Sequence, residues 1–189
     1  MAWRRNKIAE LKDAALFKQE YPATAAEAFQ MSGHDSFIKP ELVARARKAN
    51  LEPSGPLVIG LDPARFGDDS TALARRRGRK VFKVERKSKW DTMQIVGWAK
   101  QVIDTEKPAR MFIDVGGLGA GIYDRLKEMG YERIIRAVNF ASSPLEPPKF
   151  DDGGKEIPGP LNRRAEMWMN SKEWLADVGG ADIPDSDSL

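Results

Sequence analysis

The sequence predicts an α/β fold in which three hairpin-linked strands are followed by strands joined through helical crossovers. Two apolar stretches, within residues 56–63 and 109–117, each stop at an aspartate with a Pro or Gly one or two positions later, which is typical of buried strands. Between them lie a hairpin-like turn near residues 76–79 and a helical pattern after Asp91. The resulting mixed sheet differs from the regular strand–helix alternation of a dinucleotide-binding fold.

The main domain is expected to alternate strands and helices, with bounds that follow from hydrophobic period and breaker residues. In chain order we expect strands at 57–62, 70–75 and 80–86, a helix capped by Asp91 with Gln94 at the capping-box position, a strand ending at 114, a helix that stops at Gly130, and a strand at 133–138. A mobile loop at 141–160, rich in Pro, Ser and Gly, then precedes a helix at 161–176 and an acidic tail.

Residues 1–53 differ in pattern and are predicted to be a connector that precedes the main domain, residues 54–189. The expected elements of the connector are all short: an amphipathic helix at 8–17, a helical turn with the capping-box residues Thr24 and Glu27, a helix that starts at Pro40 and runs to about residue 50, and a linker at 52–56.

The composition excludes several classes of site. The chain has 189 residues, of which 41% are hydrophobic, enough for one packed domain and an appendage. It has no cysteine, so disulfides, a cysteine nucleophile and cysteine-bound zinc are excluded. The single histidine, His34, lies in a polar stretch, so we expect a surface residue rather than part of a Ser-His-Asp triad.

Neither a membrane span nor a signal peptide is apparent in the sequence. No apolar run approaches the roughly 20 residues that cross a bilayer, and the N-terminus has no apolar core of the signal-peptide type. We therefore expect a soluble protein in the cytoplasm. The formal net charge is only +3, so any nucleic-acid contact depends on local clusters of basic residues.

Asp62 and Asp114 end the two buried strands. If these strands are parallel neighbours, their backbones lie roughly 4.8 Å apart. The two carboxylates would then be able to share metal ions about 3.5–4 Å apart, as in two-metal phosphodiester chemistry. An aspartate at a strand end also caps helices or binds ribose in other α/β proteins, so the pattern alone leaves both interpretations open.

The turns that follow the two strands carry further candidates. Asp69 lies in an acid-rich turn and either orients a metal-bound water or caps its own backbone. The glycine-rich segment 116–121 departs from the dinucleotide fingerprint because Ile122 stands where the third glycine is needed. We expect these glycines to allow a tight turn and close packing of the next helix. No Walker A pattern is present, so a P-loop ATPase is excluded.

Basic residues are concentrated at the predicted hairpin and just beyond it: Arg75, Arg76, Arg77, Arg79 and Lys80, and then Lys83, Arg86, Lys87 and Lys89. A charge run usually forms a solvated face. Beside an acidic metal site, however, a cationic rim would hold a phosphate backbone against the repulsion of the carboxylates. The residues predicted to contact DNA are Arg65, Arg76, Arg77, Arg79 and Lys80.

Four segments, in this order, resemble the nuclease half of phage terminase large subunits, the DNA-packaging motors: residues 17–29, 60–72, 112–124 and 162–168. The resemblance covers nearly the whole chain, and it implies an RNase H-like fold. It also implies that Asp62 and Asp114 are the first two catalytic, metal-binding acids. Asp69, singled out by the acid-rich turn, is a further metal-binding candidate. The implied cofactors are two divalent ions, Mg²⁺ or Mn²⁺.

The same resemblance implies an endonuclease that cuts double-stranded DNA concatemers during head filling. The implied partners are double-stranded DNA, the portal protein and the small terminase subunit, in the host cytoplasm and without a membrane. Two departures from the family pattern are visible in the sequence: the ATPase half is missing, and the third acid is not apparent. Glu166 is a candidate substitute, although an acid on a helix more often pairs along the exposed helix surface. We therefore expect an incomplete nuclease domain.

Three other interpretations stay open. An actin- or hexokinase-type phosphotransferase shares the three-strand opening but needs two such domains, and ATP binding would distinguish it. A resolvase- or RNase H-type nuclease would have the same fold and metals but would prefer four-way junctions or RNA–DNA hybrids. A non-catalytic remnant would bind DNA or a portal partner without cutting, which the missing third acid favours.

Overall fold

A computed structural model of the protein describes residues 36–64 and 69–185. The chain divides into two compact units, Met1–Ala44 and Arg45–Leu189. The helix predicted at 8–17, the capping box at Thr24 and Glu27, and His34 lie outside the described residues. Within the described ranges, no helix is long and apolar enough to cross a membrane.

The described elements follow the predicted order. The helices are α4 (Pro40–Lys48), α5 (Thr92–Glu106), α6 (Gly119–Leu126), a π-helical turn η1 (Lys127–Tyr131) and α7 (Arg163–Ala176). The strands are β1 (Leu57–Asp62), β2 (Ser70–Arg77), β3 (Lys80–Ser88), β4 (Arg110–Asp114), β5 (Ile135–Val138), β6 (Lys149–Phe150) and β7 (Glu156–Ile157). Strands β2 and β3 each extend two residues beyond the predicted end, to Arg77 and Ser88.

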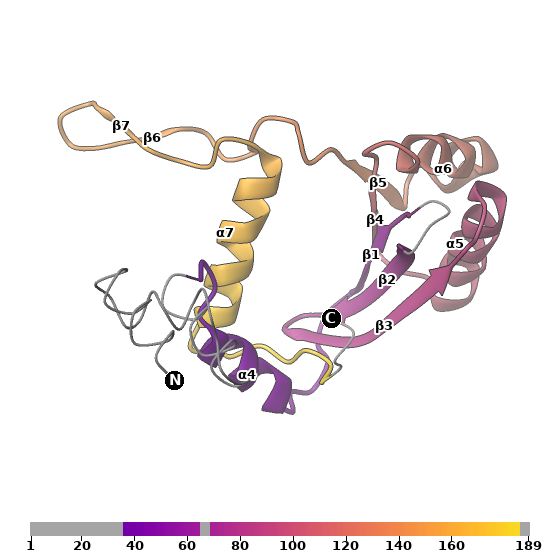
Figure 1. The fold of residues 1–189 in the computed structure, drawn as a ribbon, viewed down its shortest axis with the longest axis horizontal. Helices are drawn as coiled ribbons and strands as arrows, with labels where there is room; N and C mark the ends of the chain where they lie inside the picture. The colour runs from indigo at the N-terminus through magenta and orange to yellow at the C-terminus, as the bar shows by residue number, and fades with distance from the viewer. Residues whose placement is uncertain (1–35, 65–68, 186–189) are drawn as a thin grey trace, which may run out of the picture. The chain divides into compact units, whose positions relative to one another are not determined.

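A mixed five-stranded sheet with the order β3-β2-β1-β4-β5 forms the centre of the larger unit (Figure 1). Strands β1, β2 and β3 are antiparallel neighbours, whereas β4 lies parallel to β1 and β5 lies parallel to β4. The antiparallel pairs follow from short connections, and the parallel pairs from the helical crossovers α5 and α6. The prediction of three hairpin-linked strands followed by crossover strands is confirmed.

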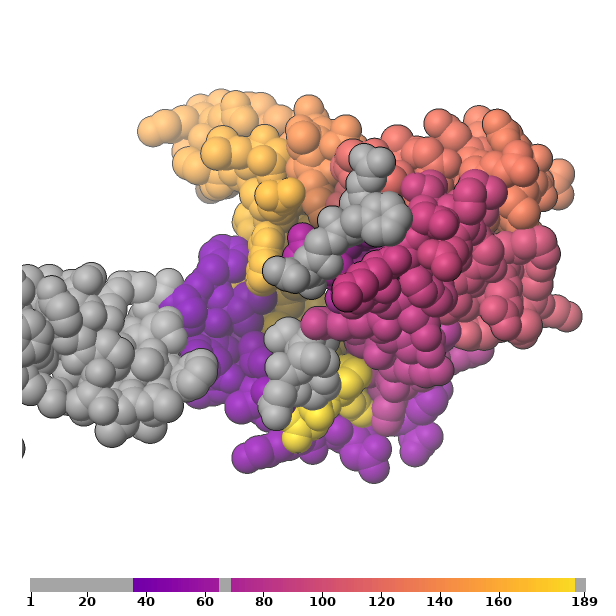
Figure 2. Space-filling model, turned by 45° about the vertical axis from the view of Figure 1, so that its right-hand side comes forward, coloured from indigo at the N-terminus to yellow at the C-terminus, as the bar shows by residue number. Residues whose placement is uncertain are grey.

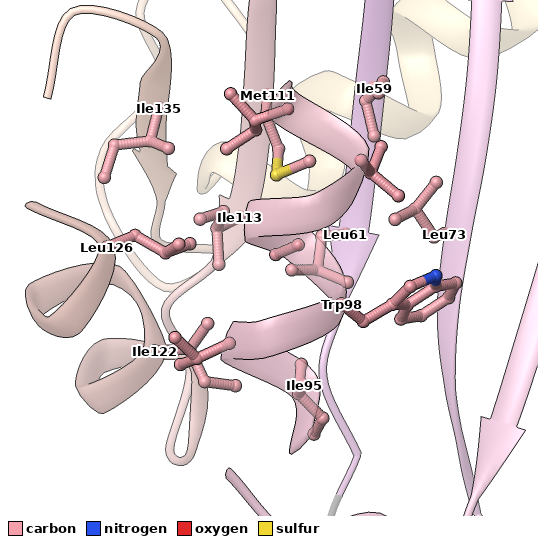
Figure 3. Packing of buried hydrophobic residues seen from close by; sticks show 14 of the residues in the cluster. Ile59, Leu61, Leu73, Ile95, Trp98, Met111, Ile113, Ile122, Leu126 and Ile135 are labelled. Atoms are coloured by element: carbon pink, nitrogen blue, oxygen red, sulfur yellow. The ribbon is translucent and has the colours of Figure 1, made fainter. Parts of the chain in front are cut away.

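Helices α5 and α6 cover one face of this sheet and close the hydrophobic core (Figure 3). Ile59 of β1, Met111 and Ile113 of β4, and Ile122 of α6 are fully buried in it. Each such side chain contributes about 1.5–3 kcal/mol to folding relative to an exposed position. The capping box predicted at Asp91 and Gln94 is present and starts α5.

The alternation of buried and exposed residues along β1 and β4 gives the sheet a second, more open face. Leu61 and Ile113 turn into the core, so their neighbours Asp62 and Asp114 lie on the opposite side. On that side Phe112 is 40% exposed. The strand pattern therefore places both aspartates away from the helices that fill the core.

Arg75 of β2 is buried, with 3% of the residue exposed, on the face that α5 covers. Its guanidinium pairs with Glu106 at the end of α5 at 2.7 Å and with Glu85 of β3 at 2.6 Å. Hydrogen bonding to Glu106 raises the pKa of Arg75 further above its ordinary value. Arg75 therefore links β2 to β3 and to α5, and its charge is paired within the protein.

The segment predicted to be a structureless loop, residues 141–160, contains a small antiparallel hairpin of β6 and β7. Lys149 pairs with Ile157 and Phe150 pairs with Glu156, and all of these residues are exposed. The hairpin lies at the outer surface of the molecule, in the orange region of Figure 2. The expectation of a loop was therefore wrong for Lys149–Phe150 and Glu156–Ile157, which form strands.

The acidic tail is also more ordered than its composition predicts. Asp182 is 7% exposed and forms an isolated parallel bridge with Lys80. Its carbonyl accepts a hydrogen bond from the Val81 N–H at 2.8 Å, and its carboxylate lies 3.0 Å from the Lys80 ammonium. The tail thereby covers part of the β3 edge, which would otherwise present unpaired backbone groups.

Candidate functional site

The register of β1 and β4 places Asp62 and Asp114 side by side at the carboxyl ends of these two strands. Leu61 pairs with Ile113 in the parallel ladder, so the next residue on each strand is an aspartate on the same face. Neighbouring strands lie about 4.8 Å apart, which leaves the two carboxylates on adjacent positions at one edge of the sheet. The structure therefore brings together the two acids that the sequence singled out.

The two carboxylates influence one another electrostatically. Partial burial, and then the nearby negative charges of Asp114 and Asp69, raise the pKa of the Asp62 carboxyl above its ordinary value. Like charges held close together favour the protonated form of one member. A cation bound between them would remove this repulsion, so the arrangement favours binding of a positively charged ligand.

An open pocket of about 610 Å³ lies beside Asp62. Its lining mixes acidic, small and basic residues, contributed by β1, the turn after it, β2, β3 and the approach to α6: Asp62, Pro63, Ala64, Asp69, Ser70, Ala72, Arg86 and Leu118. Arg86 and Leu118 were not assigned to the site from the sequence. At about 610 Å³, the pocket has a volume that can hold a phosphate group beside the Asp62 carboxylate.

Asp69 lies at the rim of this pocket, where its charge reaches Asp62. The described part of the chain contains no group of three or more His, Asp or Glu side chains close enough to hold a metal ion together. The site therefore offers Asp62 and Asp114 as a pair. Carboxylate oxygens are the ligands that Mg²⁺ and Mn²⁺ prefer, so the residue types of this pair fit these ions.

The glycines after Asp114 let the chain turn sharply into α6. Gly117 has φ +61°, in the left-handed region that favours glycine. A Cβ on Gly119 would lie 1.6 Å from the Asp114 carbonyl oxygen, so only glycine allows α6 to start this close to β4. The Gly116 N–H donates a hydrogen bond of 2.8 Å to the Asp114 carboxylate. The expected tight turn and close packing are confirmed, and they also orient Asp114.

The predicted DNA-contacting residues of the hairpin lie at the other end of the sheet. Arg77 pairs with Leu57, the first residue of β1, and Arg76 pairs with Val58. Asp62 is five residues further along β1, a separation of about 17 Å at the rise of a β-strand. Arg65 lies outside the described residues. The structure therefore does not bring the hairpin cations to the acidic pocket, and their contact with DNA stays a prediction.

Most of these hairpin cations have partners within the protein. Arg79 donates hydrogen bonds to the carbonyls of Trp174 and Gly180 and lies 5.5 Å from the Trp174 ring centroid. Lys80 pairs with Asp182, and Arg77 donates to the Gly55 carbonyl at 2.9 Å. These contacts connect the β2–β3 turn to the residues after α7 and before β1. A structural role accounts for much of the cluster.

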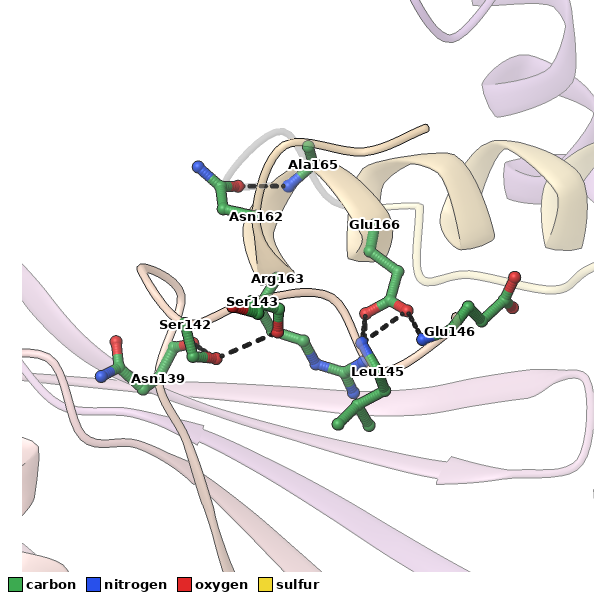
Figure 4. A network of polar contacts seen from close by, with 9 residues as sticks. All are labelled: Asn139, Ser142, Ser143, Leu145, Glu146, Asn162, Arg163, Ala165 and Glu166. Carbon is green, nitrogen blue, oxygen red and sulfur yellow. Dashed lines mark hydrogen bonds and ion pairs between the residues drawn. The ribbon is translucent and has the colours of Figure 1, made fainter. Parts of the chain in front are cut away.

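Glu166 is not available as a third site acid (Figure 4). It is 2% exposed, and its carboxylate accepts hydrogen bonds from the Leu145 and Glu146 N–H groups at 2.8–3.1 Å and pairs with Arg163. These interactions, the Glu146 N–H first, lower the pKa of Glu166. The expectation of an exposed acid on a helix surface was wrong, because the segment before α7 folds over this carboxylate.

Comparison with solved structures shows the fold. The nuclease domain of the large terminase subunit gp2 of bacterial virus Sf6 aligns with a TM-score of 0.60 and 19% identity, over 78% of this chain and 73% of that one. A mutant of the same domain, solved with manganese and β-thujaplicinol, gives a TM-score of 0.61 and 18% identity over the same shares. Another mutant, solved with calcium, gives 0.53. No protein-family model and no curated protein matches the sequence.

These terminase nuclease domains have an RNase H-like fold, so the predicted fold class is confirmed. At this level of identity the comparison establishes the architecture. The chemistry of the present chain has to be argued from its own side chains.

Proposed function

We propose that this chain is the metal-dependent nuclease domain of a phage DNA-packaging terminase, and that it cuts double-stranded DNA during genome packaging. One observation carries the proposal: Asp62 and Asp114 end adjacent parallel strands in register and on the same face, and an open pocket lies beside Asp62. The fold shared with a terminase nuclease domain supports it. The portal protein, the small terminase subunit and the host cytoplasm belong to the same proposal as partners and location.

In this proposal Asp62 and Asp114 hold the divalent ions, Mg²⁺ or Mn²⁺ and two in number, with Asp69 as a candidate further ligand. Bound ions of this kind supply positive charge for the phosphodiester and lower the pKa of the attacking water. The Gly116 N–H keeps the Asp114 carboxylate oriented, and the open pocket beside Asp62 admits the DNA backbone. Arg76, Arg77, Arg79 and Lys80 remain proposed contacts to DNA further along the duplex. Arg65, which lies outside the described residues, remains a proposed DNA contact as well.

The test is nicking of supercoiled plasmid by the purified chain in Mn²⁺. Asp62→Asn and Asp114→Asn are each expected to lower the nicking rate by about a hundredfold or more, because loss of a group that merely supports a metal ligand already costs 10–100-fold. Asp124→Asn is the matched control, since Asp124 is an exposed aspartate on α6. Nicking by Asp62→Asn at the wild-type rate would refute the assignment.

A second candidate function is DNA binding without cutting. It is favoured by the absence, among the described residues, of three or more acids grouped closely enough to hold a metal ion together, because fewer ligands hold metal ions less firmly. A folded wild-type chain that binds duplex DNA but does not nick plasmid in either Mn²⁺ or Mg²⁺ would select this candidate over the nuclease.

A further inference from the structure

Arg86 is the one basic side chain among the described residues that line the acidic pocket. It lies near the end of β3, on the strand two positions away from β1 in the sheet. The sequence groups it with the other cations of the hairpin. The structure separates it from them, because β3 runs from the turn back toward the acidic end of the sheet.

The sheet register gives the reason for this placement. Asp62 pairs with Ala72, and Ala72 pairs with Arg86, so the three residues form one row across β1, β2 and β3. Residues opposite one another in neighbouring strands point to the same face. The Arg86 backbone is therefore about 10 Å from that of Asp62, two strand spacings away. The small side chain of Ala72 between them leaves room for a ligand to contact both.

Arg86 also differs from the hairpin cations in its contacts. Within the described part of the chain it forms no ion pair and no hydrogen bond through its side chain. Arg79 and Lys80, by contrast, are bound to carbonyls near the end of α7 and to Asp182. The side chain of Arg86 is exposed. Its positive charge therefore remains available beside the carboxylates of the pocket.

We propose that Arg86 is a phosphate-binding residue of the site, which holds a non-bridging oxygen of the DNA strand beside Asp62. This inference rests on the proposed nuclease function and assigns a substrate contact within it. A guanidinium presents two parallel N–H groups that match phosphate oxygens, and its charge offsets the repulsion between the DNA backbone and the aspartates. Arg86 thus supplies at the pocket the cationic contact that the hairpin cluster, about 17 Å away, does not provide there.

The experiment measures binding of a 20-base-pair DNA duplex in Ca²⁺ over a series of salt concentrations, together with plasmid nicking in Mn²⁺. Arg86→Gln is expected to weaken duplex binding on the order of tenfold. It should also reduce the salt slope, the magnitude of the slope of log binding constant against log salt concentration, by about one, as expected for one lost phosphate contact. Arg86→Lys keeps the charge and should restore the slope, but it should nick more slowly because the paired N–H geometry is lost. The control is Arg110→Gln, which removes an exposed arginine from the same sheet face at the opposite end of β4.

The outcomes separate this inference from the proposed function. Equal affinity and equal salt slope for Arg86→Gln and the wild type would overturn the inference while nicking by the wild type still supports the nuclease. Equal losses in Arg86→Gln and Arg110→Gln would also overturn it, because the effect would then belong to the whole face. Weaker binding by Arg86→Gln alone, with no nicking by any variant, would support the phosphate contact and refute the nuclease. A wild-type chain that does not bind the duplex would overturn both.

Discussion

At the scale of single residues, the position of Asp114 depends on the glycines that follow it. A Cβ at Gly119 would overlap the Asp114 carbonyl oxygen, whereas a Cβ at Gly121 in the same helix would meet nothing within 4 Å. Gly119→Ala should therefore destabilise the protein by about 3 kcal/mol or more, at the upper end of overpacking costs. Gly121→Ala should be neutral or stabilising by about 0.5–1 kcal/mol, because alanine favours the helix. Urea denaturation of both variants measures the difference, and equal stabilities would contradict the close packing.

Single residues also mark the limit of what the sequence predicts. Asp62 and Asp114 were identifiable because an acid at the end of an apolar run is a local pattern. The location of Arg86 was not, because it depends on pairing across three strands. The order of antiparallel strands nevertheless contained this information. The turn between β2 and β3 lies beside the start of β1, so cations near the turn are far from Asp62, whereas cations near the end of β3 are close to it.

At the scale of elements, Glu166 connects α7 to the segment before it. Because the pKa of Glu166 is lowered in the folded protein, its ionised carboxylate stabilises the folded state at pH values above the ordinary glutamate pKa of about 4.3. This stabilisation is lost as the pH falls through the lower pKa of the folded state. Glu166→Gln should increase hydrogen exchange at the Leu145 and Glu146 amides near neutral pH, and the difference from wild type should vanish in acid. Glu173→Gln, an exposed acid on the same helix, is the control. Unchanged protection of both amides in Glu166→Gln would count against this role.

Elements with strong local signals were predicted well, and those fixed by distant contacts were not. The start of α5 at Asp91 follows from a capping box within four residues. The bridge between Asp182 and Lys80 joins residues about a hundred positions apart, so no local sequence pattern predicts it. The hairpin of β6 and β7 was missed because two-residue strands carry too little alternation to detect.

At the scale of the whole molecule, the sheet holds the Asp62 carboxylate in a position that destabilises the folded protein but is required for the proposed chemistry. The raised pKa of Asp62 means that its charged form is disfavoured in the folded protein. The resulting loss of stability is absent at pH values below the pKa of Asp62 in the unfolded chain, about 3.9, and it is fully present at pH values above the raised pKa of the folded state. In metal-free buffer near neutral pH, Asp62→Asn is therefore expected to be slightly more stable than wild type, by less than about 1 kcal/mol for a charge that is largely solvated.

Divalent metal should reverse this order, because an ion that binds only the folded state stabilises it by mass action. At a Mn²⁺ concentration ten times the dissociation constant, the wild type should gain about 1.4 kcal/mol in free energy of unfolding. Asp62→Asn should gain much less, and Asp124→Asn, away from the pocket, should gain as much as wild type. Urea denaturation with and without Mn²⁺ measures all three. An equal gain in wild type and Asp62→Asn would place the metal elsewhere on the protein and remove the main support for Asp62 as a ligand, whatever the plasmid assay shows.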